Sequence, residues 1–396
     1  MVEANKGDVS RALRTTMVIA LFLRIAVLLF ILSIGRSFSD PYYISDDRTY
    51  ELLATRYLGI ARTPFDLSAF KAIGAYGYLE VFWPWVMCVS AKLVGSVYAG
   101  RIINCLLSVI NIKLVYDLTI QVCKSELVAL RAARLMAFLP VMVLVCCFPI
   151  KDIFLMYAVL NTFLLLVRWQ GDDAIPLRSL IWEGLLLYAV NHTRGAILEF
   201  FVIIFMLFLI AKIRETGNNK LLFISIVAIV VMMAFLWNPI MMAFQVKADA
   251  YGGVVENGNM IKMIQMRNPW EIYKIPFSYF YATLQPFLLN LFDFEKLSIW
   301  AYIINLLNIS IYPVAIGNYL YIFQRKHNAL LWVSSTILMA AISALSLGNS
   351  RHYFFLMPYT ILNFFLATEK PSNTCRFAIY LGPFILFFLV ILMTVR

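Results

Sequence analysis

Two adjacent carboxylates, Asp46 and Asp47, are the strongest candidates for acid–base chemistry in this chain. They precede Tyr50 in the string SDDRTY (residues 45–50), at the start of an amphipathic stretch that predicts a short helix over residues 47–60. A carboxylate at such a place can accept a proton from an attacking hydroxyl. It can equally cap the helix and interact favourably with the helix dipole. The local pattern leaves both interpretations open.

An ionic pair, Lys151-Asp152, separates two apolar runs directly after Pro149. Charged side chains at membrane depth cost roughly 2.5–3.5 kcal/mol each on insertion scales, so they tend to be paired or functional. The proline predicts a helix break near the membrane surface, where this cost is smaller. The pair therefore marks either a polar turn or a substrate-binding site.

Two basic motifs lie at the predicted outer ends of apolar runs. One is NHTRG (191–195), which contains His192 and Arg194, and the other is NSRHY (349–353), which contains Arg351 and His352. Arginine is disfavoured on the outer side of a membrane, and its guanidinium suits a lipid phosphate, so both arginines are candidate phosphate ligands. The alternative is that each anchors its helix at the interface. The histidines lack closely spaced partners for a metal, so hydrogen-bonding roles are expected for them.

The composition is that of a polytopic membrane protein. Of 396 residues, 62% are hydrophobic and 14% charged, and the mean hydropathy is +0.81. Apolar runs of about 20 residues match the thickness of the bilayer core. Nothing alternates as barrel strands do, so the spans are predicted to be helices. The net charge of +11 is spread through short loops, which favours lipid headgroups over nucleic acid as the partner.

The basic residues fix a predicted orientation. The first apolar run follows a basic start and lacks a small-residue cleavage site, so it is expected to remain as the first span. A second acidic pair, Asp172-Asp173, lies among basic residues and is expected to be a solvated turn. Because positive loops stay in the cytoplasm, the N-terminus is predicted to be cytoplasmic, with six basic clusters on that side: Lys6/Arg11/Arg14, Lys124/Arg131/Arg134, Arg168/Arg178, Lys212/Arg214/Lys220, Arg325/Lys326 and Lys370/Arg376.

We therefore expect an all-α integral membrane domain over residues 1–396 with about eleven spans. Two outer loops are expected, 36–98 with juxtamembrane helices and 241–298. The aromatic segments 76–96 and 277–292 are expected to lie in the outer interface, since a span at 76–96 would turn later basic clusters outward. The predicted spans are 17–35, 99–120, 128–148, 153–169, 179–193, 196–211, 221–240, 299–323, 329–347, 353–367 and 377–395.

The remaining polar and sulfur-containing residues are assigned to packing. No two of the six cysteines have CxxC spacing and none has CxxH spacing, so neither a disulfide framework nor a structural metal is predicted, and the cysteines are expected to be buried small hydrophobic residues. Arg24 and Glu183 lie within apolar runs. Arg24 is close enough to a basic end to extend its head group toward the surface.

With these residues in place, the chain resembles the GT-C class of membrane glycosyltransferases, closest to the branch with protein O-mannosyltransferases and lipid A aminoarabinose transferases (family 39-like). The resemblance covers residues 16–200 by short motifs and the rest by layout. Its features are the acidic motif Asp46-Asp47-x-x-Tyr50, the aromatic segment Gly74 to Trp85, Arg101-x-x-Asn104, Pro149 with Asp152, and Arg351 before a late span. The family motif usually reads Asp-Glu, which leaves open which aspartate is catalytic, and the basic residue often found near Tyr76 is missing.

The resemblance implies an inverting transfer of a sugar from a polyprenyl-phosphate donor on the extracytoplasmic face. Asp46 or Asp47 would be the general base. Arg351, Arg194 and Lys151 would stabilise the departing phosphate, and Asp152 would orient the acceptor, a donor hydroxyl or Lys151. Tyr50, His192 and His352 join the expected substrate-binding set. No cofactor is expected, although a divalent metal between Asp46 and Asp152 stays an alternative.

The expected partners are a polyprenyl-phosphate-linked sugar, membrane lipids and a glycan, lipid or protein acceptor, in a plasma (inner) membrane. Two other functions remain open. A polymerase or ligase of lipid-pyrophosphate repeat units would also use outer arginines but would not need Asp46. A lipid or polysaccharide transporter would place its charges near the bilayer midplane and show related halves. Here the unusual charges gather toward one surface, which favours the transferase.

Overall fold

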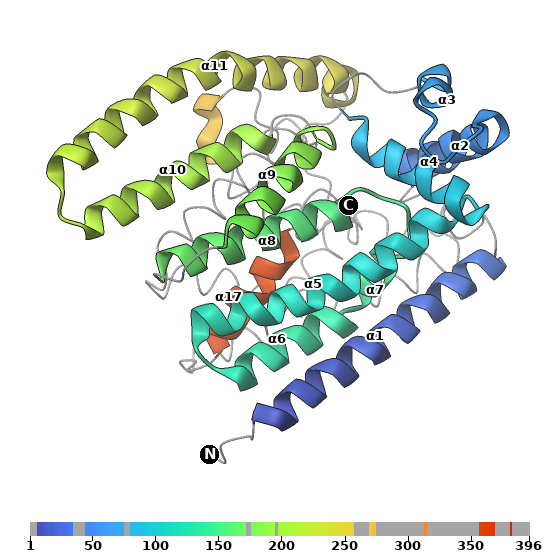
Figure 1. Ribbon diagram of the computed structural model, residues 1–396, viewed down its shortest axis with the longest axis horizontal. Coiled ribbons are helices and arrows are strands. Elements are labelled where there is room, and N and C mark those ends of the chain that lie inside the picture. Colours follow the sequence, from blue (N-terminus) through green and yellow to red (C-terminus); the bar gives the residue numbers. More distant parts are fainter. Residues whose placement is uncertain are drawn as a thin grey trace.

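The computed structural model describes residues 6–34, 44–74, 80–171, 176–194, 197–256, 269–274, 313–314, 356–368 and 381 (Figure 1). Every regular element in these ranges is helical. The elements are α1 (Lys6–Ile34), α2 (Ile44–Ile60), α3 (Leu67–Ala72), α4 (Phe82–Val94), α5 (Ala99–Cys123), α6 (Glu126–Phe138), α7 (Pro140–Val145), α8 (Asp152–Gln170), α9 (Leu177–Asn191), α10 (Ile197–Glu215), α11 (Asn219–Glu256), the 3₁₀ segment η2 (Pro269–Lys274) and α17 (Met357–Thr368).

Three of these helices are long and apolar enough to cross a bilayer. They are Gly7–Ser33 within α1, α5 and α8, and they support the assignment of a membrane protein. The predicted count of about eleven spans is not established by the described part of the chain. The expected spans 299–323, 329–347 and 377–395 lie almost wholly outside it, as does segment 277–292.

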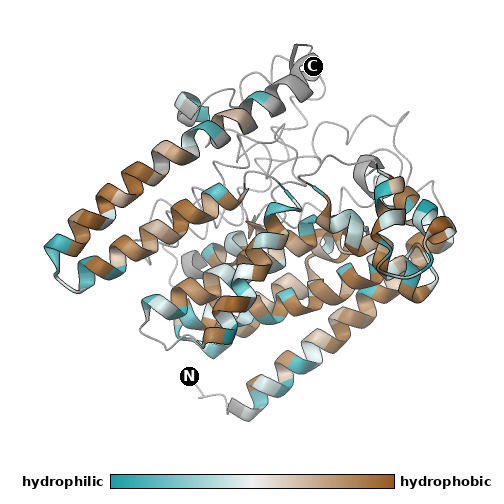
Figure 2. Ribbon diagram, turned by 45° about the horizontal axis from the view of Figure 1, so that its top comes forward, coloured by the Kyte–Doolittle hydropathy of each residue, from teal (hydrophilic) through white to brown (hydrophobic). Residues whose placement is uncertain are grey.

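The direction of each helix follows from the side chains that join them. Asn104 of α5 donates to the Phe148 carbonyl, and Asn111 donates to the Ile153 carbonyl 3.2 Å away. Both contacts advance in the same direction, so α5 and α8 run parallel. Arg24 of α1 donates to Ser108 at 2.9 Å, and α1 runs antiparallel to α5 (Figure 1). Apolar residues cover most of these helices, with hydrophilic residues gathered at the turns (Figure 2).

This arrangement puts the first four basic clusters at one end of the bundle. α1 begins there, and the turn at Lys124, a residue with φ 55°, joins α5 to α6. Lys212 near the end of α10 donates to the Gln170 carbonyl at the end of α8, 3.4 Å away. The opposite end holds α2, α4, the starts of α5 and α8 and the end of α9. This grouping agrees with the charge pattern of a membrane protein, whereas the orientation in a membrane stays a prediction.

The predicted span 128–148 is wrong as a continuous helix. α6 ends at Phe138 and α7 begins at Pro140, with Leu139 extended at φ −62°, ψ 119°. Proline has no N–H to continue the helix, and it disfavours helical geometry in the residue before it. The carbonyl of Met136, four residues earlier, therefore has no helical partner.

Arg24 supplies the missing donors at this break. Its guanidinium donates to the carbonyls of Ala137 at 2.9 Å and Met136 at 3.5 Å. The side chain is 0% exposed. This burial agrees with the assignment of Arg24 to packing, and the alternative in which it extends toward the membrane surface does not hold: the side chain points inward because freed carbonyls lie there.

Two other segments differ in length from their predictions. α11 continues to Glu256, sixteen residues past the predicted span end at 240, so the expected loop 241–298 begins as helix. Strong helix formers such as Met241, Met242 and Ala243 follow that point. α4 has thirteen residues, about 20 Å, too short for the roughly 30 Å bilayer core. That length agrees with the interfacial placement predicted for segment 76–96.

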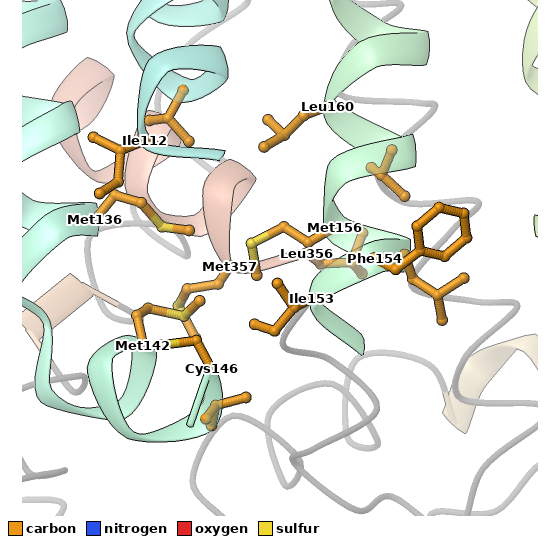
Figure 3. Close-up of a cluster of buried hydrophobic side chains, with 14 of the residues drawn as sticks. Ile112, Met136, Met142, Cys146, Ile153, Phe154, Met156, Leu160, Leu356 and Met357 are labelled. Carbon is orange, nitrogen blue, oxygen red and sulfur yellow. The ribbon is translucent and has the colours of Figure 1, made fainter. Parts of the chain in front are cut away.

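The core also includes a segment from late in the chain. Leu356 and Met357, at the start of α17, lie beside Ile153 and Met156 of α8 and near Met142 of α7 (Figure 3). These side chains are at most 5% exposed. The region of the predicted span 353–367 therefore packs against the helix that begins with Asp152.

Candidate functional site

Three of the predicted site residues converge at the end of the bundle opposite the basic clusters. The Nη1 of Arg194 lies 3.7 Å from Oδ1 of Asp152, and both side chains are buried, at 9% and 1% exposure. The Nζ of Lys151 lies 2.8 Å from Oε2 of Glu80. The groups come from the end of α9, the start of α8 and the segment before α4, so only the fold brings them together.

Local structure explains how these charges are held. Lys151 is the N-cap of α8 and Asp152 its first residue, where the helix dipole stabilises a carboxylate. Arg194 follows α9 and its N–H donates to the Val190 carbonyl at 2.9 Å. The His192 carbonyl accepts from the N–H of Phe82 at 2.9 Å, which joins the end of α9 to the start of α4.

The His192 ring packs edge-on against Tyr188, with ring centroids 4.5 Å apart. Its Nδ1 is buried and makes no hydrogen bond to any described residue. The structure thus places His192 two residues from Arg194, with a buried ring nitrogen that has no described hydrogen-bond partner.

A third ion pair connects α2 to this end. The Nε of Arg101 donates to Oε1 of Glu51 at 2.6 Å, and its guanidinium lies over the Phe148 ring at 5.7 Å. Tyr50, beside Glu51, is 2% exposed and belongs to the core with Trp83. α2 is therefore fixed through two adjacent residues.

Asp46 and Asp47 lie in the first turn of α2, which begins at Ile44. They are inside the helix rather than at its cap, which corrects the capping interpretation but keeps a favourable place on the helix dipole. Their side chains are outside the described part of the structure. Arg351 and His352 also lie outside it, and the described chain resumes at Leu356.

The stretch that leads to Lys151-Asp152 is held by its carbonyl groups. Residues 146–150 lie between α7 and α8, and the carbonyl oxygen of each accepts a hydrogen bond from a side chain of α4 or α5. The pairs are Cys146 with the Cys105 thiol (3.6 Å), Cys147 with Arg101 (3.4 Å), Phe148 with Asn104 (2.6 Å), Pro149 with the Trp83 indole (2.8 Å) and Ile150 with Asn104 (2.8 Å). A buried segment without regular structure needs such donors, and they fix the backbone that carries the site.

A separate set of hydrogen bonds holds the turn after α2. Asp66 caps α3 by accepting from the Ala69 N–H at 3.0 Å, and it also accepts from the Arg62 N–H at 3.0 Å and the Ser68 hydroxyl. The hydrogen bond from Ser68, followed by those from the two backbone N–H groups, lowers the pKa of Asp66 to about 2. Tyr57 donates to the Pro64 carbonyl at 3.0 Å, and burial raises the pKa of its hydroxyl. These contacts hold α2 in place against α3.

Sequence reasoning missed Glu80 and the pairing of Glu51 with Arg101, and it treated Trp83 only as an aromatic anchor of the interfacial segment. Glu80 stands directly before the aromatic run of α4, which is a weak signal for an interfacial acid. Arg101 and Asn104 were noted only as a family motif, while their contacts show that one holds α2 and both hold the 146–150 segment. No local pattern indicates those partners, because they lie 44 to 50 residues away.

Three of the cysteines lie closer together in the structure than their spacing in the sequence suggested. Cys88, Cys105, Cys146 and Cys147 are buried free thiols. The sulfurs of Cys105, Cys146 and Cys147 lie within 4.8 Å of one another and are the one group in the described residues with the ligand types and spacing for a metal ion. The group lies deeper in the bundle than the ion pairs.

No family model matches the chain, and neither does any curated protein or solved structure. What the chain does must therefore be argued from its own residues.

Proposed function

We propose that this protein is an inverting glycosyltransferase that moves a sugar from a polyprenyl-phosphate donor to a hydroxyl of a lipid, glycan or protein acceptor. The observation that supports this best is the convergence of Lys151, Asp152 and Arg194 at the bundle end opposite the basic clusters. If the basic end faces the cytoplasm, this site lies at the extracytoplasmic face of a plasma (inner) membrane.

Arg194 suits a lipid phosphate. Its Nη1 is buried and makes no hydrogen bond to the described residues, and its nearest described carboxylate oxygen is 3.7 Å away, beyond normal hydrogen-bond distance. A phosphate oxygen would gain a charge-assisted hydrogen bond there. Lys151, held by Glu80, adds a second cation beside it.

In the proposed reaction the acceptor oxygen attacks the anomeric carbon from the face opposite the phosphate. The acceptor O–H proton goes to Asp46 or Asp47, the glycosidic C–O bond forms, and the bond to the lipid phosphate breaks. Arg194 and Lys151 stabilise the charge that develops on the phosphate, and Arg351 joins them. Asp152 orients Arg194. No cofactor is required in this scheme.

The test uses the full chain reconstituted in liposomes with a panel of polyprenyl-phosphate sugars, scored for transfer or donor hydrolysis. Removing one donor to the departing phosphate costs on the order of 10²–10³ in rate, so Arg194→Gln should lose that much. Arg178→Gln is the matched control, because Arg178 is an exposed residue at the other end of α9. Equal rates for the two variants would contradict the role of Arg194.

The carboxylates separate this function from its alternatives. Asp46→Asn or Asp47→Asn should lower transfer about 10²–10⁴-fold, the usual contribution of a general base. The double variant at the other acidic pair, Asp172→Asn/Asp173→Asn, should keep full activity. Polymer formation by a chain with Asn at both 46 and 47 would favour a polymerase or ligase, and translocation of an unconsumed donor would favour a transporter.

A further inference from the structure

Three buried thiols meet in the interior of the bundle. Cys105 belongs to α5, while Cys146 and Cys147 follow α7, and all three are 0% exposed. Their sulfurs lie within 4.8 Å of one another. As thiols they donate to backbone carbonyls: Cys105 to Cys146 (3.6 Å), Cys146 to Val143 (3.0 Å), and Cys147 to Val143 (3.2 Å) and Arg24 (3.5 Å).

The guanidinium of Arg24 lies beside this group. It donates to the Ser108 hydroxyl at 2.9 Å, one turn after Cys105 on α5, and the backbone carbonyl of Arg24 accepts from the Cys147 thiol at 3.5 Å. The other described partners of the guanidinium are the neutral carbonyls of Ala20, Met136 and Ala137. Among the described residues no carboxylate pairs with Arg24, so a buried positive charge stands next to three groups that become negative on losing a proton.

We propose that Cys105, Cys146 and Cys147 bind one thiophilic divalent ion of the Zn(II) type. Thiolates are the ligands such an ion prefers, and each thiol gives up its proton to solvent when the ion binds. The charges of one divalent ion, three thiolates and the Arg24 guanidinium cancel. A neutral assembly is what an apolar interior tolerates, because isolated charges there are costly.

The geometry needs only a small adjustment. Zn–S bonds of about 2.3 Å in a tetrahedral site place sulfurs about 3.8 Å apart, against the observed separations of up to 4.8 Å. Rotation of the thiols from their carbonyl partners toward a common centre closes most of that difference. Ser108 lies three residues after Cys105, on the same face of α5, so its hydroxyl is the group we propose for the fourth ligand that Zn(II) usually takes.

The site would join α5 to the start of the 146–150 segment. An ion there would fix the segment at the end remote from Lys151-Asp152. This inference does not depend on the proposed transferase activity, because it is tested by metal content and coordination alone.

The experiment measures metal in the purified full chain under reducing conditions. Zn(II) is supplied during expression, since the thiols are inaccessible in the folded chain, and loosely bound ions are removed with a weak chelator. We expect one Zn(II) per chain in the wild type, loss of it in Cys105→Ser and Cys146→Ser, and retention in Cys88→Ser and Cys123→Ser, whose thiols lie outside the group.

X-ray absorption on the wild-type protein provides a readout that needs no variant. It should show three sulfur ligands at about 2.3 Å. A wild-type chain without Zn(II), equal retention by Cys105→Ser, or fewer than three sulfur neighbours would each overturn the proposal. If the serine variants fail to fold, the absorption spectrum of the wild type decides alone.

Discussion

Asn104 is the residue on which the backbone of the candidate site depends most directly. Its Nδ2 donates to the carbonyls of Phe148 at 2.6 Å and Ile150 at 2.8 Å. The side chain is 0% exposed, so water cannot replace it. Replacement by leucine keeps the approximate size and removes both donors.

The expected cost follows from these two bonds. A buried carbonyl left without a donor costs about 1–3 kcal/mol, so the two together cost about 2–6 kcal/mol. Part of this is offset because the Oδ1 of Asn104 makes no hydrogen bond to the described residues, and burying an unpaired amide oxygen costs roughly 1–3 kcal/mol. Taking the low and high estimates together, a net destabilisation of about 1–3 kcal/mol is expected for Asn104→Leu.

Asn161→Leu is the matched control. The Nδ2 of Asn161 donates to the Tyr157 carbonyl at 2.8 Å within the same helix, and that carbonyl keeps its place in the helical ladder when the amide is gone. The change should therefore shift the free energy of unfolding by less than about 1 kcal/mol. Both asparagines lie on helices assigned to the membrane bundle, which makes the comparison fair.

The assay combines two measurements on detergent-solubilised protein. Unfolding by a denaturing detergent gives the stability difference, and hydrogen exchange read by mass spectrometry gives its location. Asn104→Leu should speed exchange in the peptide that spans residues 146–152, whereas Asn161→Leu should leave it unchanged. If the two variants have the same free energy of unfolding and the same rate of hydrogen exchange in that peptide, the Asn104 amide does not hold the segment and the reasoning fails.

Three further perturbations test neighbouring parts of the argument. A Cβ at Gly100 would clash with the Met87 sulfur. Because that flexible thioether can shift, Gly100→Ala should cost about 1 kcal/mol in thermal unfolding, the low end for overpacking, and it should cost less in a chain that already carries Met87→Ala. The pKa of Asp66 is lowered from 3.8 to about 2, so its cap stabilises α3 above pH 4 and this stability is lost as the pH falls through 2. The Tm of the wild type should therefore fall relative to that of Asp66→Asn between pH 4 and 2. Parallel plots of Tm against pH for the two proteins would exclude the cap as the cause. Arg24→Leu should speed exchange at the α6–α7 break, less so when Pro140→Ala restores an N–H there.

Apolar runs predicted the long helices well. The spans drawn at 99–120 and 153–169 fall within α5 and α8 with ends displaced by three residues or fewer. The short helix at 47–60 is α2, which begins three residues earlier. These elements follow from periodicity and length, which are local properties that a sequence displays directly.

The break in the span 128–148 was not predicted, although Pro140 was visible. A proline inside an apolar run can kink a membrane helix or end it, since neighbouring groups can satisfy the freed carbonyls. Which outcome holds depends on whether another helix offers donors at that depth. Here Arg24 does, and it lies 113 residues from the carbonyl it bonds.

The candidate site could be predicted only in part for the same reason. Lys151, Asp152 and Arg194 stood out because charges interrupt apolar runs there, and the structure brings them together. Glu80 and Trp83 carry no comparable signal, since an acid and a tryptophan are ordinary in an interfacial segment. Their importance comes from contacts with Lys151 and with the Pro149 carbonyl.

Polar groups in the interior and at the end of the bundle are held in different ways. In the interior, Glu183 of α9 accepts a hydrogen bond from the Thr162 hydroxyl of α8, and Arg24 bonds to carbonyls and a hydroxyl. These partners are neutral, so no paired anion lies there for an anionic ligand to displace. At the end of the bundle, cations face carboxylates instead, which an anionic ligand can replace.

The three end pairs differ in how easily an anion could enter. Arg101 and Lys151 bond to their carboxylates at 2.6 and 2.8 Å, so a competing phosphate would first have to break a charge-assisted hydrogen bond. Arg194 faces Asp152 at 3.7 Å, too far for such a bond, in a place too buried for water to screen the charge. The interaction energy lost when a phosphate oxygen approaches is therefore smallest at Arg194. For this reason Arg194, rather than Arg101 or Lys151, is the residue at which the proposed donor should bind.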